Sequence, residues 1–174
     1  DNPITGEVWY NDTDNVLKFQ YPNTTTSGAW STGNDLNSAR EYGTGTGADS
    51  TAVLIWAGYP NSALTEQYNG VNWTEVNDLN TARRYPGAAG TYTAALGFGG
   101  GTITGKTEKW NGTNWTEVND LNTARNELAG AGETNTEALA FGGTEPPVST
   151  KTESWNGTNW TEVNDLGTAR YLLS

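Results

Sequence analysis

A block of 19 residues occurs three times, and this repetition constrains the fold more than any other feature. The copies are TEQYNGVNWTEVNDLNTAR at 65–83, TEKWNGTNWTEVNDLNTAR at 107–125 and TESWNGTNWTEVNDLGTAR at 152–170. A degenerate copy, GAWSTGNDLNSAR, ends at Arg40, so equivalent residues recur every 42 to 45 positions. A unit of this length cannot bury a hydrophobic face alone and must stack against its neighbours.

Each repeat predicts four short strands. In the second repeat these are RRYPGAAG, TAALGFGG, TEKW and NWTEV. The second of them alternates between large and small side chains, as a strand does. Asn111–Gly112 separates the last two, and Asn-Gly between β-prone runs is a strong hairpin signal. With no helical periodicity, the fold class expected is all-β, a β-propeller with four-stranded blades. We expect its axis near the strands TAVLI, TAALGF and TEALAF.

The repeat is similar to the kelch repeat. The residues that carry the resemblance are Gly99–Gly100, Trp110, Trp115, Leu121 and Arg125, and again Gly142–Gly143, Trp155, Trp160, Leu166 and Arg170. The first full repeat departs from the pattern with Ala57–Gly58 and Tyr68, and the spacing between the aromatic residue and the Trp is one residue short. Kelch repeats occur in enzymes, adhesins and scaffolds, so the resemblance implies a propeller and not an activity.

The N-terminal segment carries a second resemblance. NPITGEVWYNDTDNVLKFQY, residues 2–21, looks like a short motif of bacteriophage virion appendages. Together with the near-identical repeats, it resembles kelch-like, tail-fibre-like proteins of marine phages.

The two ends of the chain predict a shared blade. Residues 7–10, 16–21 and 29–32 suggest strands two to four, and RYLLS at 170–174 aligns with the first strand of a blade. We therefore expect one domain over 1–174, with a partial blade at 1–39, repeats at 40–82, 83–124 and 125–169, and a closing strand at 170–174. Four blades would then form a ring without free strand edges. The alternatives are a fragment of a longer chain and a ring shared by several chains.

Composition excludes several functions. The formal charge of −11 argues against nucleic acid, and no segment suggests a membrane. Without His, Cys or Met, the chain lacks a Ser-His-Asp or Cys-His site and the preferred ligands of zinc and copper. We expect no cofactor and no metal, although calcium at Asn119–Asp120 and its equivalents is an alternative. The recurring carboxylates are interpreted as solvated, since copied positions have equivalent environments and cannot divide acid and base roles. They are Glu75, Glu117, Glu162, Asp78, Asp120 and Asp165.

The recurring aromatic and basic residues suggest different roles. We expect Trp73, Trp115 and Trp160 to pack between blades. Arg83, Arg125 and Arg170 should bond nearby backbone or Asp78, Asp120 and Asp165. Trp110 and Trp155, beside the hairpins, are expected to be partly exposed, where a ring next to amides could cover a sugar face. The candidate ligand-binding residues are Trp110, Asn111, Thr113, Trp155, Asn156, Thr158, Tyr68 and Asn69.

These observations favour a non-enzymatic, extracellular or virion-surface binding module. Its expected partner is a cell-surface glycan or host receptor, bound with avidity through repeated sites. A homo-oligomer or virion assembly is compatible with this hypothesis. One alternative is a purely structural appendage or filament subunit without a ligand, and another is a polysaccharide-active enzyme.

Overall fold

The computed structural model describes residues 8–11, 16–19 and 33–172, and the chain divides into two compact units at residue 32. The first unit contains an antiparallel pair, β1 (Val8–Asn11) and β2 (Val16–Phe19), where the sequence predicted strands. The strand predicted at 29–32 lies outside the described residues. Residues 33–40 belong to the second unit together with the repeats.

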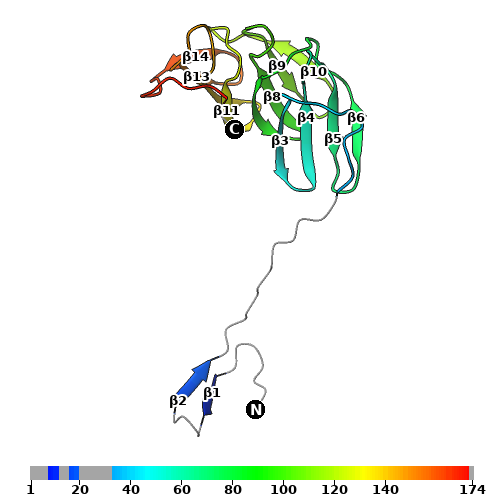
Figure 1. The fold of residues 1–174 in the computed structure, drawn as a ribbon, viewed down its shortest axis with the longest axis vertical. Coiled ribbons are helices and arrows are strands. Elements are labelled where there is room, and N and C mark those ends of the chain that lie inside the picture. Colours follow the sequence, from blue (N-terminus) through cyan, green and yellow to red (C-terminus); the bar gives the residue numbers. More distant parts are fainter. Residues whose placement is uncertain (1–7, 12–15, 20–32, 173–174) are drawn as a thin grey trace. The chain divides into compact units, whose positions relative to one another are not determined.

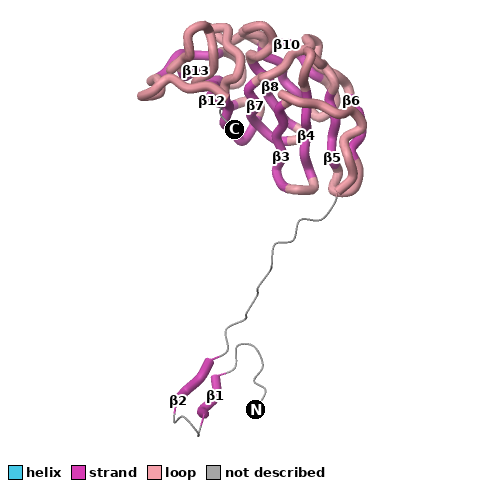
Figure 2. The backbone as a smooth tube through the Cα atoms, in the orientation of Figure 1, coloured by secondary structure: helices cyan, strands magenta, loops and turns pink. Residues whose placement is uncertain are grey.

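The second unit consists of three four-stranded antiparallel sheets, one for each repeat, and its described residues contain no helix (Figures 1 and 2). The predicted strands are confirmed: each sheet runs in chain order from a first to a fourth strand. Sheet 1 holds β3 (Thr44–Asp49), β4 (Ala52–Trp56), β5 (Thr65–Tyr68) and β6 (Trp73–Val76). Sheet 2 holds β7 (Gly87–Thr91), β8 (Ala94–Phe98), β9 (Thr107–Trp110) and β10 (Trp115–Val118). Sheet 3 holds β11 (Ala129–Thr134), β12 (Glu137–Phe141), β13 (Thr152–Trp155) and β14 (Trp160–Val163).

The first strands, not the second, bring the sheets together. β7 packs between β3 and β11, which corrects the expectation that TAVLI, TAALGF and TEALAF surround the axis. The reason is side-chain size, because the first strands are rich in Gly and Ala and allow close approach. A Cβ on Gly130 of β11 would lie 2.2 Å from the carbonyl oxygen of Ala88 in β7. The second strands instead carry the large residues that fill the space between neighbouring sheets.

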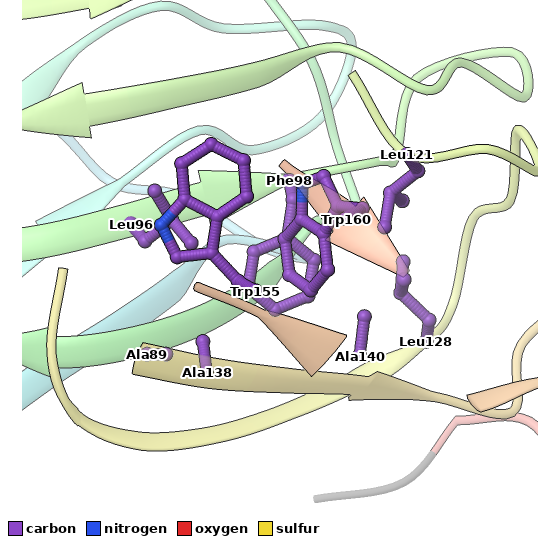
Figure 3. Close-up of a cluster of buried hydrophobic side chains, with 9 residues drawn as sticks. All are labelled: Ala89, Leu96, Phe98, Leu121, Leu128, Ala138, Ala140, Trp155 and Trp160. Carbon is purple, nitrogen blue, oxygen red and sulfur yellow. The ribbon is translucent and has the colours of Figure 1, made fainter. Parts of the chain in front are cut away.

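Two equivalent hydrophobic cores lie between the sheets. One joins Leu54 and Trp56 of sheet 1 to Trp110 and Trp115 of sheet 2. The other joins sheet 2 to sheet 3, where Figure 3 shows Leu96 and Phe98 beside the indole rings of Trp155 and Trp160. The edge-on ring pairs are equivalent too: Trp56 and Trp115 have centroids 5.0 Å apart, and Phe98 and Trp160 have centroids 4.9 Å apart. The predicted packing of Trp115 and Trp160 between repeats is confirmed.

The three sheets form a propeller-like arrangement that is not closed. No fourth sheet is present among residues 33–172, and the described part of RYLLS, residues 170–172, forms no strand. Leu172 nevertheless continues a backbone pattern of the repeats. Tyr85 N–H donates to the Tyr42 carbonyl, Glu127 N–H to the Tyr85 carbonyl, and Leu172 N–H to the Glu127 carbonyl, at 2.9, 3.1 and 3.0 Å.

Candidate functional site

The two Trp residues predicted to face a ligand are buried. Trp110 and Trp155 are 0% and 1% exposed, so the expectation of a partly exposed ring is wrong. Each indole lies inside an intersheet core, and its Nε1 donates a 3.1 Å hydrogen bond to a backbone carbonyl, of Tyr92 and Asn135 respectively. Tyr68, the equivalent in sheet 1, is half-buried. Neither Trp ring is available to a sugar in this structure.

The hairpin amides have structural roles. The turn between β9 and β10 is typical: Asn111 Oδ1 accepts hydrogen bonds from the backbone N–H groups of Thr113 and Asn114, at 2.9 and 2.8 Å. Asn69 and Asn156 do the same in their own turns. Thr113 and Thr158 are exposed, but their carbonyls accept from side-chain amides of the preceding repeat. The hairpin tips are thus part of the attachment between repeats.

The attachment is made by connecting segments, which we define as residues 34–40, 77–83, 119–125 and 164–170. In the second of these, Asn77 Nδ2 donates to Asn114 Oδ1 at 2.7 Å, and Asn80 donates through its backbone and side chain to Glu108 Oε2, at 2.7 and 2.9 Å. The first and third segments make the same contacts with sheets 1 and 3. Each described junction between repeats therefore uses one copied set of bonds.

The first three connecting segments each place a buried arginine side chain against the next sheet, whereas Arg170 of the fourth segment is exposed. Arg83 pairs with Glu108, and both side chains are fully buried. The equivalent pairs are Arg40–Glu66 and Arg125–Glu153. The predicted backbone contacts of the arginines are confirmed, but the predicted Asp partners are wrong: Asp120 Oδ1, for example, accepts the backbone N–H of Thr107. Sequence reasoning missed Glu66, Glu108 and Glu153, although each stands at a fixed place in the repeated block.

The arginines also hold the two ends of a set of loops together. Arg83 Nη1 donates to the carbonyls of Gly99 and Lys106, at 3.2 and 2.7 Å, and these residues bound the β8–β9 loop. Arg40 and Arg125 hold the β4–β5 and β12–β13 loops in the same way. Unlike the hairpins, these loops differ between repeats: AGYPNSAL at 57–64, GGGTITGK at 99–106 and GGTEPPVSTK at 142–151. We name them the variable loops. Their sequences differ, although the arginine contacts at their bases are the same in each repeat.

The variable loops lie at the end of the sheets opposite the hairpin tips. Strand register establishes this, because Thr44 pairs with Trp56 and Trp56 with Thr65, whereas Tyr68 pairs with Trp73 at the other end. The loop end also carries a cavity of about 650 Å³. Its walls come from all three first strands, from the residues before them, and from Leu172. This volume lies within the usual range for small-molecule sites.

Tyrosine rings gather beside this cavity. Tyr42 and Tyr85 line it and stack with centroids 4.4 Å apart and an interplanar angle of 30°. Tyr59, in the first variable loop, meets Tyr42 edge-on at 6.3 Å, and the guanidinium of Arg84 lies 5.3 Å from the Tyr59 ring centre. Tyr42 and Tyr59 are 48% and 52% exposed. We name Tyr42, Tyr59, Arg84 and Tyr85 the tyrosine cluster.

The backbone at the cavity is strained. Tyr42, Tyr85, Glu127 and Leu172 occupy equivalent positions, and all have positive φ, of 57°, 53°, 55° and 51°. Residues with side chains rarely adopt this conformation, and it occurs often at functional sites. Partial desolvation, with contributions from Tyr42 and Glu127, raises the pKa of the Tyr85 phenol. A sequence signal for this site existed in the aromatic residues that follow Arg40 and Arg83.

Neither a metal cluster nor a membrane-spanning helix is found in the described parts of the chain. No group of three potential ligands among His, Cys, Asp and Glu residues could hold a metal ion there. None of the described segments is a helix long and apolar enough to cross a membrane.

No protein-family model and no curated protein sequence matches the chain. Among solved structures, the one named "Structure of YjhT" is similar, with a TM-score of 0.63 at 13% sequence identity. The similarity covers 78% of this chain and 54% of that one, so the chain spans about half the length of that protein. At this identity the similarity concerns the fold alone.

Proposed function

We propose that the protein is a non-enzymatic binding module that recognises cell-surface glycans through the tyrosine cluster. The observation that carries this proposal is the stacked pair of the exposed Tyr42 and the half-buried Tyr85 beside the cavity of about 650 Å³. Aromatic rings that keep a polar hydroxyl at the edge suit ligands with both apolar faces and hydroxyl groups, as sugars have. We therefore place the binding site at the end of the sheets opposite the hairpin tips, and not at the hairpin tips as the sequence predicted.

The variable loops support a recognition role. They sit on bases held by copied arginine contacts, while their own sequences differ. Binding residues concentrate on loops that a rigid scaffold positions, because loops can change without loss of the core. The three unlike loops lie at the same end of the sheets as the cavity, which favours a single composite site over repeated equivalent sites.

The arrangement of carboxylates supports binding without catalysis. The buried carboxylates Glu66, Glu108 and Glu153 each pair with an arginine and accept backbone hydrogen bonds. Glycoside hydrolysis uses two carboxyl groups in unlike environments. These copied pairs have like environments and serve the attachment of one sheet to the next.

We place the module on an extracellular or virion appendage, as a kelch-like, four-bladed ring. The support is the repeated block, the three described sheets, and the resemblance of residues 2–21 to phage appendage proteins. A purely structural subunit is the second candidate. This candidate is favoured by the outer faces of sheets 1 and 3, which no other described sheet covers. Leu139 of sheet 3 is exposed there, and Trp73 of sheet 1 is half-buried.

A glycan panel tests the proposal. The intact chain and a Tyr42→Ala, Tyr85→Ala double variant should be applied to the panel, with Asn111→Ala at a hairpin tip as the matched control. We expect binding of the intact chain and the control to the same glycans, and loss of signal for the double variant. An intact chain that binds nothing on a broad panel would favour the structural subunit.

A further inference from the structure

One position of each repeat reaches the cavity with a different side chain. The residues at this position are Tyr42, Tyr85, Glu127 and Leu172, and all four line the cavity. Their backbones share a positive φ and are joined in series by hydrogen bonds from N–H to carbonyl. Because aromatic, acidic and aliphatic residues all fit this backbone frame, the frame does not require any one of these side chains. The side chain at this position can therefore differ according to the ligand.

Glu127 is the only charged residue among the described residues that line the cavity. Thr144, in the third variable loop, donates from its Oγ1 to Glu127 Oε2 at 3.1 Å, which holds the carboxylate in place. Within residues 33–172, Glu127 forms no ion pair with a lysine or an arginine. The cavity wall therefore carries one negative charge that no described basic residue neutralises.

The charge of Glu127 also acts on the neighbouring aromatic residue. Desolvation is the largest cause of the raised pKa of the Tyr85 phenol, and the negative charge of Glu127 adds to it, whereas the positive charge of Arg84 opposes it. Both charges thus act on the ring that we propose to contact the sugar.

Arg84 is placed against the rings rather than in the cavity wall. It is not a lining residue, and its guanidinium carbon lies 5.3 and 5.9 Å from the ring centres of Tyr59 and Tyr85. A cation over an aromatic ring uses the attraction that the ammonium group of a ligand would otherwise find there. The tyrosine cluster therefore offers little to a positively charged sugar.

We propose that the cavity selects neutral glycans and that Glu127 is the residue that excludes sugars carrying a carboxylate. This inference rests on the proposed glycan binding and names the substrate class of that site. A ligand carboxylate in the cavity would lie beside the carboxylate of Glu127, and like charges at close range repel each other. Sugar hydroxyl groups can instead donate to it, since an ionised carboxylate accepts hydrogen bonds. Specificity of this kind comes from a repulsive contact as well as from attractive ones.

Pairs of glycans that differ only in charge test the selectivity. The intact chain should be titrated with oligosaccharides ending in glucose or galactose, and with counterparts ending in the corresponding uronic acid, where a carboxylate replaces the C6 hydroxymethyl group. We expect the neutral member of a pair to bind about tenfold more tightly, which corresponds to about 1.4 kcal/mol. At physiological salt the Debye length is about 8 Å, so distant charges of the protein contribute little to this ratio.

Glu127→Gln removes the charge and keeps an oxygen that can accept from Thr144. In this variant the ratio of neutral to acidic affinity should fall about tenfold, to near one. Glu133→Gln, at an exposed position of β11, is the matched control, because it changes the formal charge of −11 by the same single unit. The control should keep the ratio of the parent. If Glu127→Gln does not fold, Glu127→Leu, which introduces the residue type found at position 172, should lower the ratio in the same way.

Two results would overturn this inference and leave glycan binding by the tyrosine cluster in place. One is an unchanged ratio in the folded Glu127 variant. The other is tighter binding of the acidic member by the intact chain, and loss of that preference in Arg84→Gln would then identify Arg84 as the residue that binds carboxylates.

Counterparts ending in glucosamine or galactosamine provide a further comparison. Tighter binding of the amino sugar, lost in Glu127→Gln, would make Glu127 an attractive contact for a cation and would also contradict the selection of neutral glycans. An intact chain that binds no member of any pair would contradict the proposed function itself, and this inference with it.

Discussion

Arg125 Nη2 lies 2.9 Å from Glu153 Oε1, and both side chains are completely buried between consecutive sheets. Glu153 also accepts the backbone N–H groups of Asn122 and Thr123, and Arg125 reaches the carbonyls of Gly142 and Lys151. A single pair thus joins two sheets and the base of a variable loop. Such a pair is costly to break because the remaining charge stays buried without its partner.

Arg125→Met should therefore lower the free energy of unfolding by about 3–5 kcal/mol. The matched control is Glu117→Gln, which removes the exposed pair Lys106–Glu117 on the surface of sheet 2. Exposed pairs contribute little, so the control should unfold with the parent protein. Denaturant titration measures both variants. Equal stability of Arg125→Met and the parent would show that the pair is dispensable.

Acid should destabilise the junction at sheet 1. Burial alone would raise the pKa of the Glu66 carboxyl, but hydrogen bonds from Asn37, Arg40 and Ser38 and the charge of Arg40 outweigh it, and the pKa is lowered from 4.5. A carboxyl with a lowered pKa in the folded state stabilises fully above its unfolded pKa, and this contribution is lost as pH falls through the folded pKa. The expected loss thus begins near pH 4.5 and deepens below it.

Melting temperatures measured from pH 7 to pH 3 test this expectation. Glu66→Gln should melt lower at neutral pH and lose less on acidification than the parent does. Glu75→Gln, an exposed carboxylate on β6, is the control and should keep the parent's acid sensitivity. If the melting temperature of Glu66→Gln falls with pH as steeply as that of the parent, Glu66 does not contribute to the acid sensitivity.

Gly97 should be sensitive to the smallest substitution. A Cβ at this position in β8 would come 2.8 Å from the Trp56 Nε1 atom of the neighbouring sheet. Overpacking a core costs about 1–3 kcal/mol, so Gly97→Ala should reduce stability by that amount. Gly167→Ala is the control, since a Cβ there meets nothing within 4 Å. Gly97→Ala with the stability of the parent would show that the sheets can move apart without cost.

The sequence predicted the strands well because local signals and repetition agree. Alternation in TAALGFGG and the Asn-Gly dipeptides determine strands and hairpins within one repeat, and copying transfers each prediction to the next. Which strand of a sheet lies nearest the axis is not determined by the signals within one repeat. It depends on which strand permits close approach, and the close fit of Gly130 against Ala88 becomes evident only when the sheets are packed.

The site was harder to predict than the fold. Trp110 and Asn111 are neighbours in sequence, so an exposed turn suggested an exposed ring, but the ring lies in the intersheet core while the amide forms the turn. Tyr42 and Tyr85 are 43 positions apart in the sequence. They come together because the residues that precede the first strand of each sheet line the same cavity. Copied residues carry structural roles here, and the loops that differ between repeats lie at the same end of the sheets as the cavity.

Substitutions in the tyrosine cluster and at the hairpin tips should affect glycan binding differently. Tyr42→Ala and Tyr85→Ala should each weaken glycan binding about five- to ten-fold, corresponding to about 1 kcal/mol for one lost ring contact. The melting temperature should change little for Tyr42, because its ring is about half exposed. Thr113→Ala and Thr158→Ala, at the hairpin tips, should bind as the parent does.

Binding should depend weakly on salt, since ring stacking and neutral hydrogen bonds are not screened as charge contacts are. Titration of a glycan selected from the panel measures each affinity. Loss of binding in the threonine variants, with retention in the tyrosine variants, would return the site to the hairpin tips.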